Sequence, residues 1–240
     1  MLLESQIRSL AIQFQTSEQN VATEYCQHLF LSNLYNIKNS SKLLFKGGTA
    51  LRIIFNSSRF SEDLDFSGEN LSARDIESVL LDCLDNISYS GIETDIKESK
   101  KTSGGYLSQL NFRWNSYDVN IRVEISLRTK KMDKEVFMIA SDYLSPYSVS
   151  ALSTSSLVQE KIRATLERKK PRDFFDVYFL LRSRLVPPEQ KSLLQKVEKT
   201  IRSENINFSR ELKQFLPVSM HPVIKNFQDS FLAELKRNIG

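Results

Sequence analysis

The segment FKGGTALRIIFNSSRFSEDLDF constrains the fold of this chain more than any other stretch. A short apolar run over 42–45 predicts a buried strand, which Gly47 and Gly48 bring to an end. The apolar spacing over 49–55 predicts a short helix, and after a polar loop the residues 63–66 predict a second strand. The sequence therefore predicts a strand, a glycine turn, a helix and a strand in close succession.

Asp63 and Asp65 form a pair of carboxylates on the second of these strands. Side chains two positions apart on a strand share a face, so the two aspartates project together while Leu64 and Phe66 face the core. Two carboxylates this close repel each other unless a cation lies between them, and oxygen ligands of this kind suit Mg²⁺. The alternative is an ordinary pair at a loop end or helix cap.

Gly47 and Gly48 precede a helix that opens at Thr49. Backbone N–H groups at such a turn point outward with no side chain to exclude a phosphate, so the turn is able to cradle a triphosphate. An ordinary tight turn is the alternative. Together with the carboxylate strand, the turn supplies donors for phosphate oxygens and ligands for a metal that bridges them.

Glu124 supplies a third carboxylate from the alternating run over 119–126. It lies on the face opposite Val123 and Ile125. With two metal ions about 3.5 to 4 Å apart, three carboxylates can activate an attacking hydroxyl and stabilise a leaving pyrophosphate. The alternative is a surface glutamate paired with Arg122 or Arg128.

The sequence predicts an α+β arrangement of helices and strands in the first part of the chain and helices alone in the last part. Thr16 with Gln19, and Ser72 with Asp75, resemble capping boxes. The predicted elements are helices over 3–35 and 72–87, strands over 92–96, 106–114 and 119–127, and helices over 157–168, 172–183, 188–201 and 222–237. We expect two lobes: residues 1–150 as a catalytic lobe with N-terminal helices, and residues 151–240 as a mainly helical lobe that completes the nucleotide site.

Composition narrows the class of protein. With 240 residues, 40% hydrophobic and 26% charged, the chain suits one domain or two packed lobes. No apolar run reaches the ~18 to 20 residues of a membrane span, and the first residues lack a signal-peptide pattern, which favours the cytoplasm and no membrane partner. Two cysteines and two histidines suit neither a disulfide framework nor a His-ligated metal centre.

Charge is unevenly distributed along the chain. Residues 1–150 carry 16 basic and 19 acidic side chains, whereas residues 151–240 carry 17 and 10, so the two parts are about −3 and +7. A basic second part can attract a polyanion such as RNA. A solvated helical surface explains the same excess.

Two blocks of residues resemble the AbiEii-type family of nucleotidyltransferase toxins, within the DNA polymerase beta-like nucleotidyltransferase superfamily. The first block is Lys46-Gly47-Gly48-Thr49-Ala50-Leu51 with Ser61-Glu62-Asp63-Leu64-Asp65-Phe66. The second block is Gln159-Glu160-Lys161-Ile162-Arg163-Ala164 with Arg168, Pro171-Arg172-Asp173 and Asp176. The second block is the more specific to the family.

The resemblance implies a nucleotidyltransferase-like mixed sheet with flanking helices. It also implies a toxin of a two-gene toxin–antitoxin system that uses Mg²⁺ and a nucleoside triphosphate, with a cognate antitoxin as partner and the acceptor end of tRNA as the expected target. Carried over by residue, these roles fall into four groups. Lys46, Gly47, Gly48, Thr49 and Ser61 would contact the nucleotide; Asp63, Asp65 and Glu124 would hold metal; Lys161 would neutralise the triphosphate; and Asp173 and Asp176 would complete the pocket.

Lys161 also has a physical rationale of its own. On a helix from about residue 157, a lysine on a partly buried face can reach a phosphate as a point charge. The alternative is a surface lysine that pairs with Glu160 or Glu167. Asp173 has an alternative role in stabilising the start of its helix, and Ser61 is a candidate for modification of the protein itself.

Three other functions use the same residues. They are nucleotidyl transfer to a protein or small-molecule hydroxyl, phosphoryl transfer from the same site, and nucleotide binding without catalysis. The sequence leaves open the nucleotide, the acceptor, the antitoxin's contact surface and the oligomeric state.

Overall fold

The computed structural model describes residues 1–239. The chain divides into two compact units. The first holds residues 1–56 and 60–152, and the second holds Ser57–Arg59 and the chain from Ser153 onward.

The first unit is built on a seven-stranded sheet with strand order β3-β4-β5-β2-β1-β7-β6. The strands are β1 (Leu43–Lys46), β2 (Leu64–Glu69), β3 (Glu93–Thr102), β4 (Gly105–Trp114), β5 (Tyr117–Arg128), β6 (Lys134–Ile139) and β7 (Tyr147–Leu152). The helices of this unit are α1 (Glu4–Phe14), α2 (Glu18–Leu34), α3 (Gly47–Phe55) and α4 (Ala73–Ser88).

The sheet is mixed. β2 pairs with β5 in parallel, as β1 does with β7, whereas the other neighbouring strands are antiparallel. A parallel pair needs a crossover, and the chain makes the one from β2 to β5 through α4 and the β3–β4 hairpin. The predicted α+β class with a mixed sheet, flanking helices and a helical C-terminal part is confirmed.

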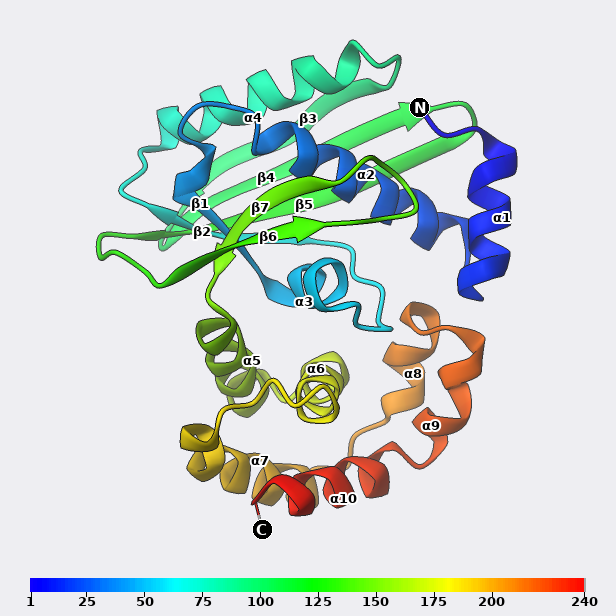
Figure 1. Ribbon diagram of the computed structural model, residues 1–240, viewed down its shortest axis with the longest axis vertical. Helices are drawn as coiled ribbons and strands as arrows, with labels where there is room; N and C mark the ends of the chain where they lie inside the picture. The colour runs from blue at the N-terminus through cyan, green and yellow to red at the C-terminus, as the bar shows by residue number, and fades with distance from the viewer. Residues whose placement is uncertain (240) are drawn as a thin grey trace. The chain divides into compact units, whose positions relative to one another are not determined.

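Helices α2 and α4 pack against each other on one face of the sheet (Figure 1). Phe66 on β2 anchors this layer: its ring lies 6.5 Å from that of Phe30 on α2 and 5.6 Å from that of Phe45 on β1. The alternation of β5 places Val123 and Ile125 on the same buried face. Removal of these side chains from water is the main favourable term for the unit.

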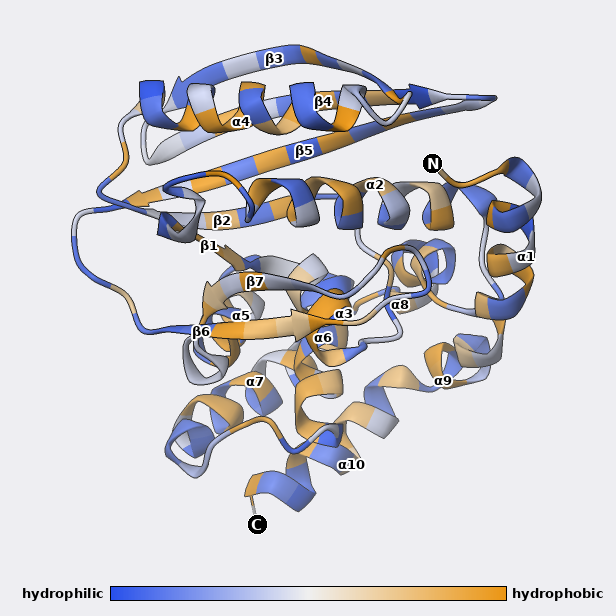
Figure 2. Cartoon of the chain, turned by 45° about the horizontal axis from the view of Figure 1, so that its top comes forward, coloured by the Kyte–Doolittle hydropathy of each residue, from blue (hydrophilic) through white to orange (hydrophobic). Residues whose placement is uncertain are grey.

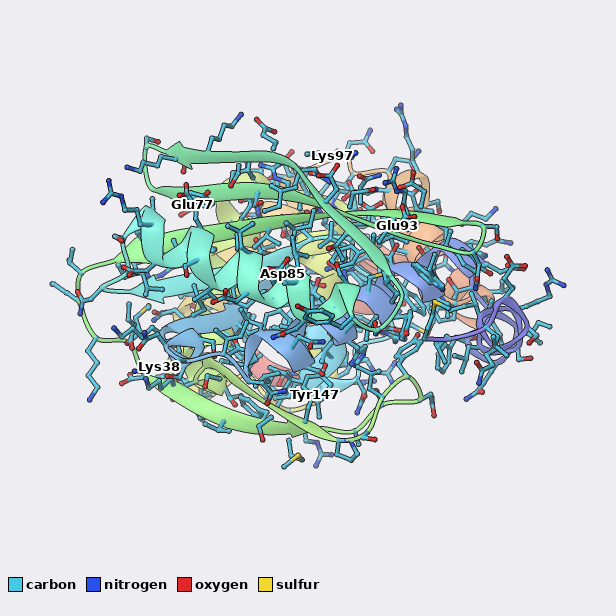
Figure 3. All side chains as sticks on the ribbon, turned by 90° about the horizontal axis from the view of Figure 1, so that it is seen from above. Lys38, Glu77, Asp85, Glu93, Lys97 and Tyr147 are labelled. Carbon is cyan, nitrogen blue, oxygen red and sulfur yellow. The ribbon has the colours of Figure 1, made fainter. Side chains whose placement is uncertain are left out.

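The spacing of apolar residues in α4 explains which side of this helix packs on the sheet. Its buried residues are almost all apolar and include Ile76, Val79, Leu80 and Leu84, and hydrophobic and hydrophilic residues lie on different sides of the helix (Figure 2). Glu77 and Asp85 lie on the outer side (Figure 3). Ser72 and Asp75 form the predicted capping box, in which Ser72 Oγ accepts from the Asp75 amide at 3.2 Å.

Several sequence predictions need correction. The capping box at Thr16 is wrong, because Ser17 is the N-cap of α2 and its hydroxyl accepts from the Asn20 amide. Strands β6 and β7 were not predicted from the sequence. β6 is an edge strand, and its apolar residues Val136 and Met138 are exposed. Cys26 and Cys83 are free, buried thiols.

The second unit is helical. Its elements are α5 (Thr154–Arg168), α6 (Pro171–Arg182), α7 (Lys191–Ser203), α8 (Phe208–Leu212), α9 (His221–Lys225) and α10 (Phe227–Ile239). An aromatic cluster holds them together, with the ring of Phe227 4.6 Å from Phe208 and 5.8 Å from both Phe175 and Phe231. The predicted helix over 222–237 is split at Asn226, and α8 was not predicted.

No helix in the described part of the chain combines the length and the apolar character that a membrane crossing requires.

Candidate active site

The junction of β1 and α3 forms one side of the candidate site. α3 begins at Gly47, and the side chain of its N-cap residue, Lys46, makes no capping hydrogen bond to the first turn. The Thr49 hydroxyl donates a hydrogen bond to the carbonyl oxygen of Asp63. This bond ties the start of α3 to the residue that leads into β2.

Gly47 lies directly against the Asp65 carboxylate. Its φ of +86° is in the left-handed region, and a Cβ added there would lie 2.1 Å from Asp65 Oδ2 and 2.8 Å from Asp65 Cβ. Both the backbone conformation and the contact therefore require glycine. The predicted glycine turn and one of the predicted metal ligands meet in space.

Asp65 and Glu124 are neighbours across the parallel pair β2 and β5. The register pairs Asp65 with Glu124, between the buried pairs Leu64 with Val123 and Phe66 with Ile125. Because adjacent strands are about 4.8 Å apart and side chains alternate, both carboxylates lie on the sheet face opposite α2. Asp63 precedes the first residue of β2.

Glu124 is paired in this structure. Its Oε1 lies 2.5 Å from an Arg122 nitrogen, and the two side chains are 45% and 51% exposed. The ion pair that we considered as the alternative to metal binding is thus present. A pair this exposed contributes only about 0 to 1 kcal/mol, so a cation can displace the guanidinium at small cost.

The donor set suits a hard divalent cation. Asp65 and Glu124 offer carboxylate oxygens from adjacent strands, and Asp63 lies two residues before Asp65. Within residues 1–239, no three His, Cys, Asp or Glu side chains are gathered as a preformed metal site. The assignment of these three residues as metal ligands stays a prediction.

Ser61 lies in the loop before β2 and is partly exposed. Its carbonyl oxygen accepts a hydrogen bond of 2.8 Å from Gln27 Nε2, and Gln27 is fully buried on α2. The sequence pattern did not single out Gln27, because a buried amide in an apolar helix carries no spacing signal. Its contact fixes the backbone close to Asp63.

Arg52 on α3 is held by a buried carboxylate. Its guanidinium donates to both oxygens of Glu24 at 2.6 and 3.1 Å, and Tyr143 Oη donates to the same carboxylate at 2.7 Å. The guanidinium also lies 4.0 Å from the Phe60 ring centre. These contacts give Arg52 a structural role between α2 and α3.

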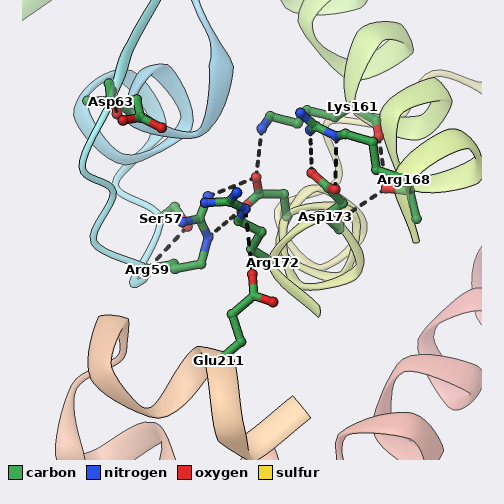
Figure 4. Close-up of polar contacts among 11 residues, drawn as sticks. Ser57, Arg59, Asp63, Lys161, Arg168, Arg172, Asp173 and Glu211 are labelled. Atoms are coloured by element: carbon green, nitrogen blue, oxygen red, sulfur yellow. Dashed lines mark hydrogen bonds and ion pairs between the residues drawn. The ribbon is translucent and has the colours of Figure 1, made fainter. Parts of the chain in front are cut away.

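A second cluster of charges lies within the helical unit, around Asp176 on α6 (Figure 4). Arg59 donates to both oxygens of Asp176 at 2.8 and 3.0 Å, and Lys161 Nζ lies 2.8 Å from Asp176 Oδ2. Asp176 is 1% exposed and Arg59 4%. The segment Ser57–Arg59 belongs to this unit through that contact.

The pKa of Asp176 reflects these two cations. Burial favours the neutral acid and by itself raises the pKa, but the charges and hydrogen bonds of Arg59 and Lys161 outweigh it and lower the pKa to about 2. The carboxylate therefore stays ionised throughout the neutral range.

Lys161 pairs with neither Glu160 nor Glu167, the two alternatives considered from sequence, but with Asp176. Asp173, in the first turn of α6, is also buried. Its carboxylate forms an ion pair of 2.6 Å with Arg168, in the last turn of α5. Both aspartates thus have cationic partners inside the helical unit. The roles of Lys161, Asp173 and Asp176 toward a nucleotide stay predictions.

A protein-family model described as the nucleotidyl transferase AbiEii toxin of a type IV toxin–antitoxin system matches residues 29–237. A search of curated proteins gives no match.

Two solved structures from Helicobacter pylori have a similar fold. JHP933 is 20% identical, with a TM-score of 0.66 and 93% of each chain covered. A second structure, described as a candidate nucleotidyltransferase, is 19% identical, with a TM-score of 0.67 and 93% of this chain and 96% of that chain covered.

The Gly47→Ala variant tests the contact between the turn and the carboxylate. Gly91→Ala is its matched control, because Gly91 has a φ of +85° but no atom within 4 Å of an added Cβ. Both variants carry the left-handed penalty of about 1 to 2 kcal/mol, and only Gly47→Ala adds the steric cost of roughly 1 to 3 kcal/mol. Denaturant unfolding of both will measure the difference. Equal stabilities would contradict the contact.

The ion cluster around Asp176 predicts a pH dependence of stability. Its pKa is lower in the folded protein than the ordinary 3.8, so its contribution, roughly 2 kcal/mol, is complete above about pH 4 and is lost as the pH falls toward 2. Asp176→Asn removes the buried carboxylate that Arg59 and Lys161 share and should destabilise the protein by about 3 to 5 kcal/mol at pH 7. Lys161→Met keeps the Arg59 pair and should cost less. A reversed order of the two variants in urea unfolding would refute this account.

Proposed function

Because the chain belongs to the AbiEii family of nucleotidyltransferase toxins of type IV toxin–antitoxin systems, we propose that it transfers a nucleotide from a Mg²⁺-bound nucleoside triphosphate to the acceptor end of tRNA. The observation that carries this proposal is the carboxylate face of β2 and β5, where Asp65 adjoins both Glu124 and the glycine turn. In this proposal, backbone amides suited to phosphate and carboxylate oxygens suited to a metal lie next to each other there.

The first turn of α3 is the proposed phosphate cradle. The positive end of the helix dipole and the amides of Gly47, Gly48 and Thr49 favour an anion. The Thr49 hydroxyl donates its hydrogen bond to the Asp63 carbonyl oxygen. In this proposal the backbone of Thr49 therefore contacts phosphate, and its side chain positions Asp63. Lys46 precedes the turn as the N-cap residue.

Asp63, Asp65 and Glu124 are the proposed ligands of the metal. Bound there, Mg²⁺ supplies charge neutralisation of the triphosphate and of the leaving group. In the transfer, the acceptor hydroxyl oxygen bonds to the α-phosphorus, the bond from that phosphorus to the bridging oxygen breaks, and pyrophosphate leaves. In this proposal Glu124, whose side chain is 45% exposed, would accept the proton of the acceptor hydroxyl.

We propose that Lys161 contributes positive charge toward the triphosphate. Its pairing with Asp176 supports this in one respect, because a buried carboxylate fixes the ammonium group in one position. Asp176, and Asp173 through Arg168, would then act as positioning residues for the second family block. Ser61, four residues before Asp65, remains a proposed nucleotide contact and a proposed site of self-modification.

The proposed acceptor is tRNA, with a cognate antitoxin as the partner that opposes the activity in the cytoplasm. The support is the excess of seven positive charges over residues 151–240, together with the family's type IV toxin–antitoxin assignment. Exposed lysines and arginines attract RNA phosphates by counterion release.

The test is incorporation of label. Purified protein, Mg²⁺ and total RNA are incubated with each nucleoside triphosphate, labelled at the α- or the γ-phosphate in parallel. Nucleotidyl transfer should place only the α-label in RNA of tRNA size and release pyrophosphate. Entry of the γ-label would identify phosphoryl transfer instead, and label in protein would refute an RNA acceptor. No incorporation from any nucleotide would refute the catalytic proposal.

Asp63→Asn and Asp65→Asn should each lower transfer by about 10³-fold or more, because each removes a metal-binding charge with little change in volume. Asp95→Asn is the control: Asp95 lies on β3, on the same sheet face, and pairs with Lys97 at 2.6 Å. It should keep near wild-type turnover. A fully active Asp65→Asn protein would remove β2 from the site.

A further inference from the structure

A hollow of about 300 Å³ adjoins the proposed catalytic face of the sheet. Its lining comes from the β3–β4 turn and from β5: Thr102, Gly104, Gly105, Tyr106, Leu107, Arg122, Glu124, Ile125, Ser126 and Arg128. The volume is at the lower end of the range for ligand pockets. Because Glu124 is part of the wall, a molecule in this hollow touches the carboxylate that we assign to the reacting hydroxyl.

The charged side chains of this wall are Arg122, Glu124 and Arg128. All three lie on one face of β5, since they are two and four positions apart. Two guanidinium groups against one carboxylate give the hollow a net positive charge. The hollow therefore suits a ligand in which an anionic group lies close to a hydroxyl group.

Both arginines are available to a ligand. Arg122 is half exposed, and its pair with Glu124 is of the weak, exposed kind. Arg128 is exposed and forms no side-chain hydrogen bond or ion pair that involves residues 1–239. Nearby Glu69 does not compete for it, because its carboxylate accepts from the Met132 amide at 2.7 Å and binds Lys134 at 3.5 Å.

The turn beside the hollow leaves room for a chain to pass. A Cβ added at Gly104 meets no atom within 4 Å, whereas one at Gly105 would lie 1.9 Å from the Ile125 carbonyl oxygen. Gly105 thus packs the turn tightly against β5, and Gly104 faces open space. An extended strand can run over Gly104 toward Glu124.

We propose that this hollow is the acceptor site, in which Arg122 and Arg128 bind backbone phosphates of the acceptor RNA and so place its terminal hydroxyl at Glu124. Guanidinium groups bind phosphate in bidentate fashion, which fixes direction as well as position. When the metal and the RNA bind, Glu124 exchanges Arg122 for Mg²⁺, and Arg122 exchanges Glu124 for a phosphate. Each new partner binds more strongly than the exposed ion pair that it replaces. The inference rests on the proposed function, because it assigns the acceptor of that same reaction.

Binding of RNA without metal or triphosphate tests the site independently of turnover. Fluorescently labelled bulk tRNA is the probe, and affinity is measured by anisotropy across a salt series. Arg122→Gln and Arg128→Gln should each weaken binding by about 5- to 10-fold and reduce the salt slope by about one. Arg128→Gln should leave the affinity for Mg²⁺ and nucleoside triphosphate at the wild-type value, whereas Arg122→Gln also removes the ion pair of Glu124.

Arg113→Gln is the matched control. Arg113 lies on the same sheet face, on β4, and forms an exposed pair with Glu93 at 3.1 Å, but it does not line the hollow. It should change tRNA affinity by less than about 2-fold. Arg128→Lys, which keeps the charge, should recover part of the lost affinity. Unfolding midpoints of all variants will show that the fold is intact.

Cross-linking locates the RNA on the surface. A photoreactive maleimide at Gly104→Cys should cross-link to tRNA on irradiation, and one at Tyr89→Cys, on a side chain that is 89% exposed at the far end of α4, should not. The native thiols do not interfere, because Cys26 and Cys83 are buried and burial raises the pKa of both.

The outcomes separate two failures. If the wild-type protein modifies tRNA but the double variant Arg122→Gln/Arg128→Gln binds and uses tRNA normally, the acceptor site is elsewhere and the proposed function stands. The same conclusion follows if Arg113→Gln weakens binding equally. If the wild-type protein binds no tRNA and labels a protein instead, both the RNA acceptor and this site are refuted.

Discussion

The parallel pairing of β2 with β5 is the constraint on which the proposed active site depends. It places Asp65 beside Glu124, although 59 positions of chain separate them, and its buried neighbours Phe66 and Ile125 hold the register. A slip of either strand by one residue would turn the carboxylate of that strand into the apolar core under α2, where an unpaired charge is strongly destabilising. The core thus determines where the polar chemistry lies.

A second constraint comes from the backbone. Gly47 approaches Asp65 so closely that only glycine fits, and Thr49 binds the carbonyl of Asp63. The strand that carries the carboxylates and the turn proposed to bind phosphate are therefore positioned by each other. In the helical unit, Asp176 has a comparable function, because it forms ion pairs with both Arg59 and Lys161. A conformational change that separates these buried charges would be strongly destabilising.

Local patterns predicted the parts of this arrangement that depend on neighbouring residues. The strand, glycine turn and helix, the capping box at Ser72 and the alternation of β5 all followed from spacing. The family resemblance added the mixed sheet. Partners distant in sequence could not be predicted: Arg59 and Asp176 are 117 positions apart. The short strands β6, at the edge of the sheet, and β7, beside it, carry a weak pattern. Long-range contacts leave no periodic trace in one sequence.

The most direct measurement of the central claim is the position of the metal. Crystals of the protein with Mn²⁺ in place of Mg²⁺ and a non-hydrolysable nucleoside triphosphate give an anomalous signal from the metal alone. The account predicts that signal within about 2 to 2.5 Å of carboxylate oxygens of Asp65 and Glu124, with the triphosphate against Gly47 and Gly48. A metal and triphosphate bound elsewhere, with Glu124 still paired to Arg122, would contradict it.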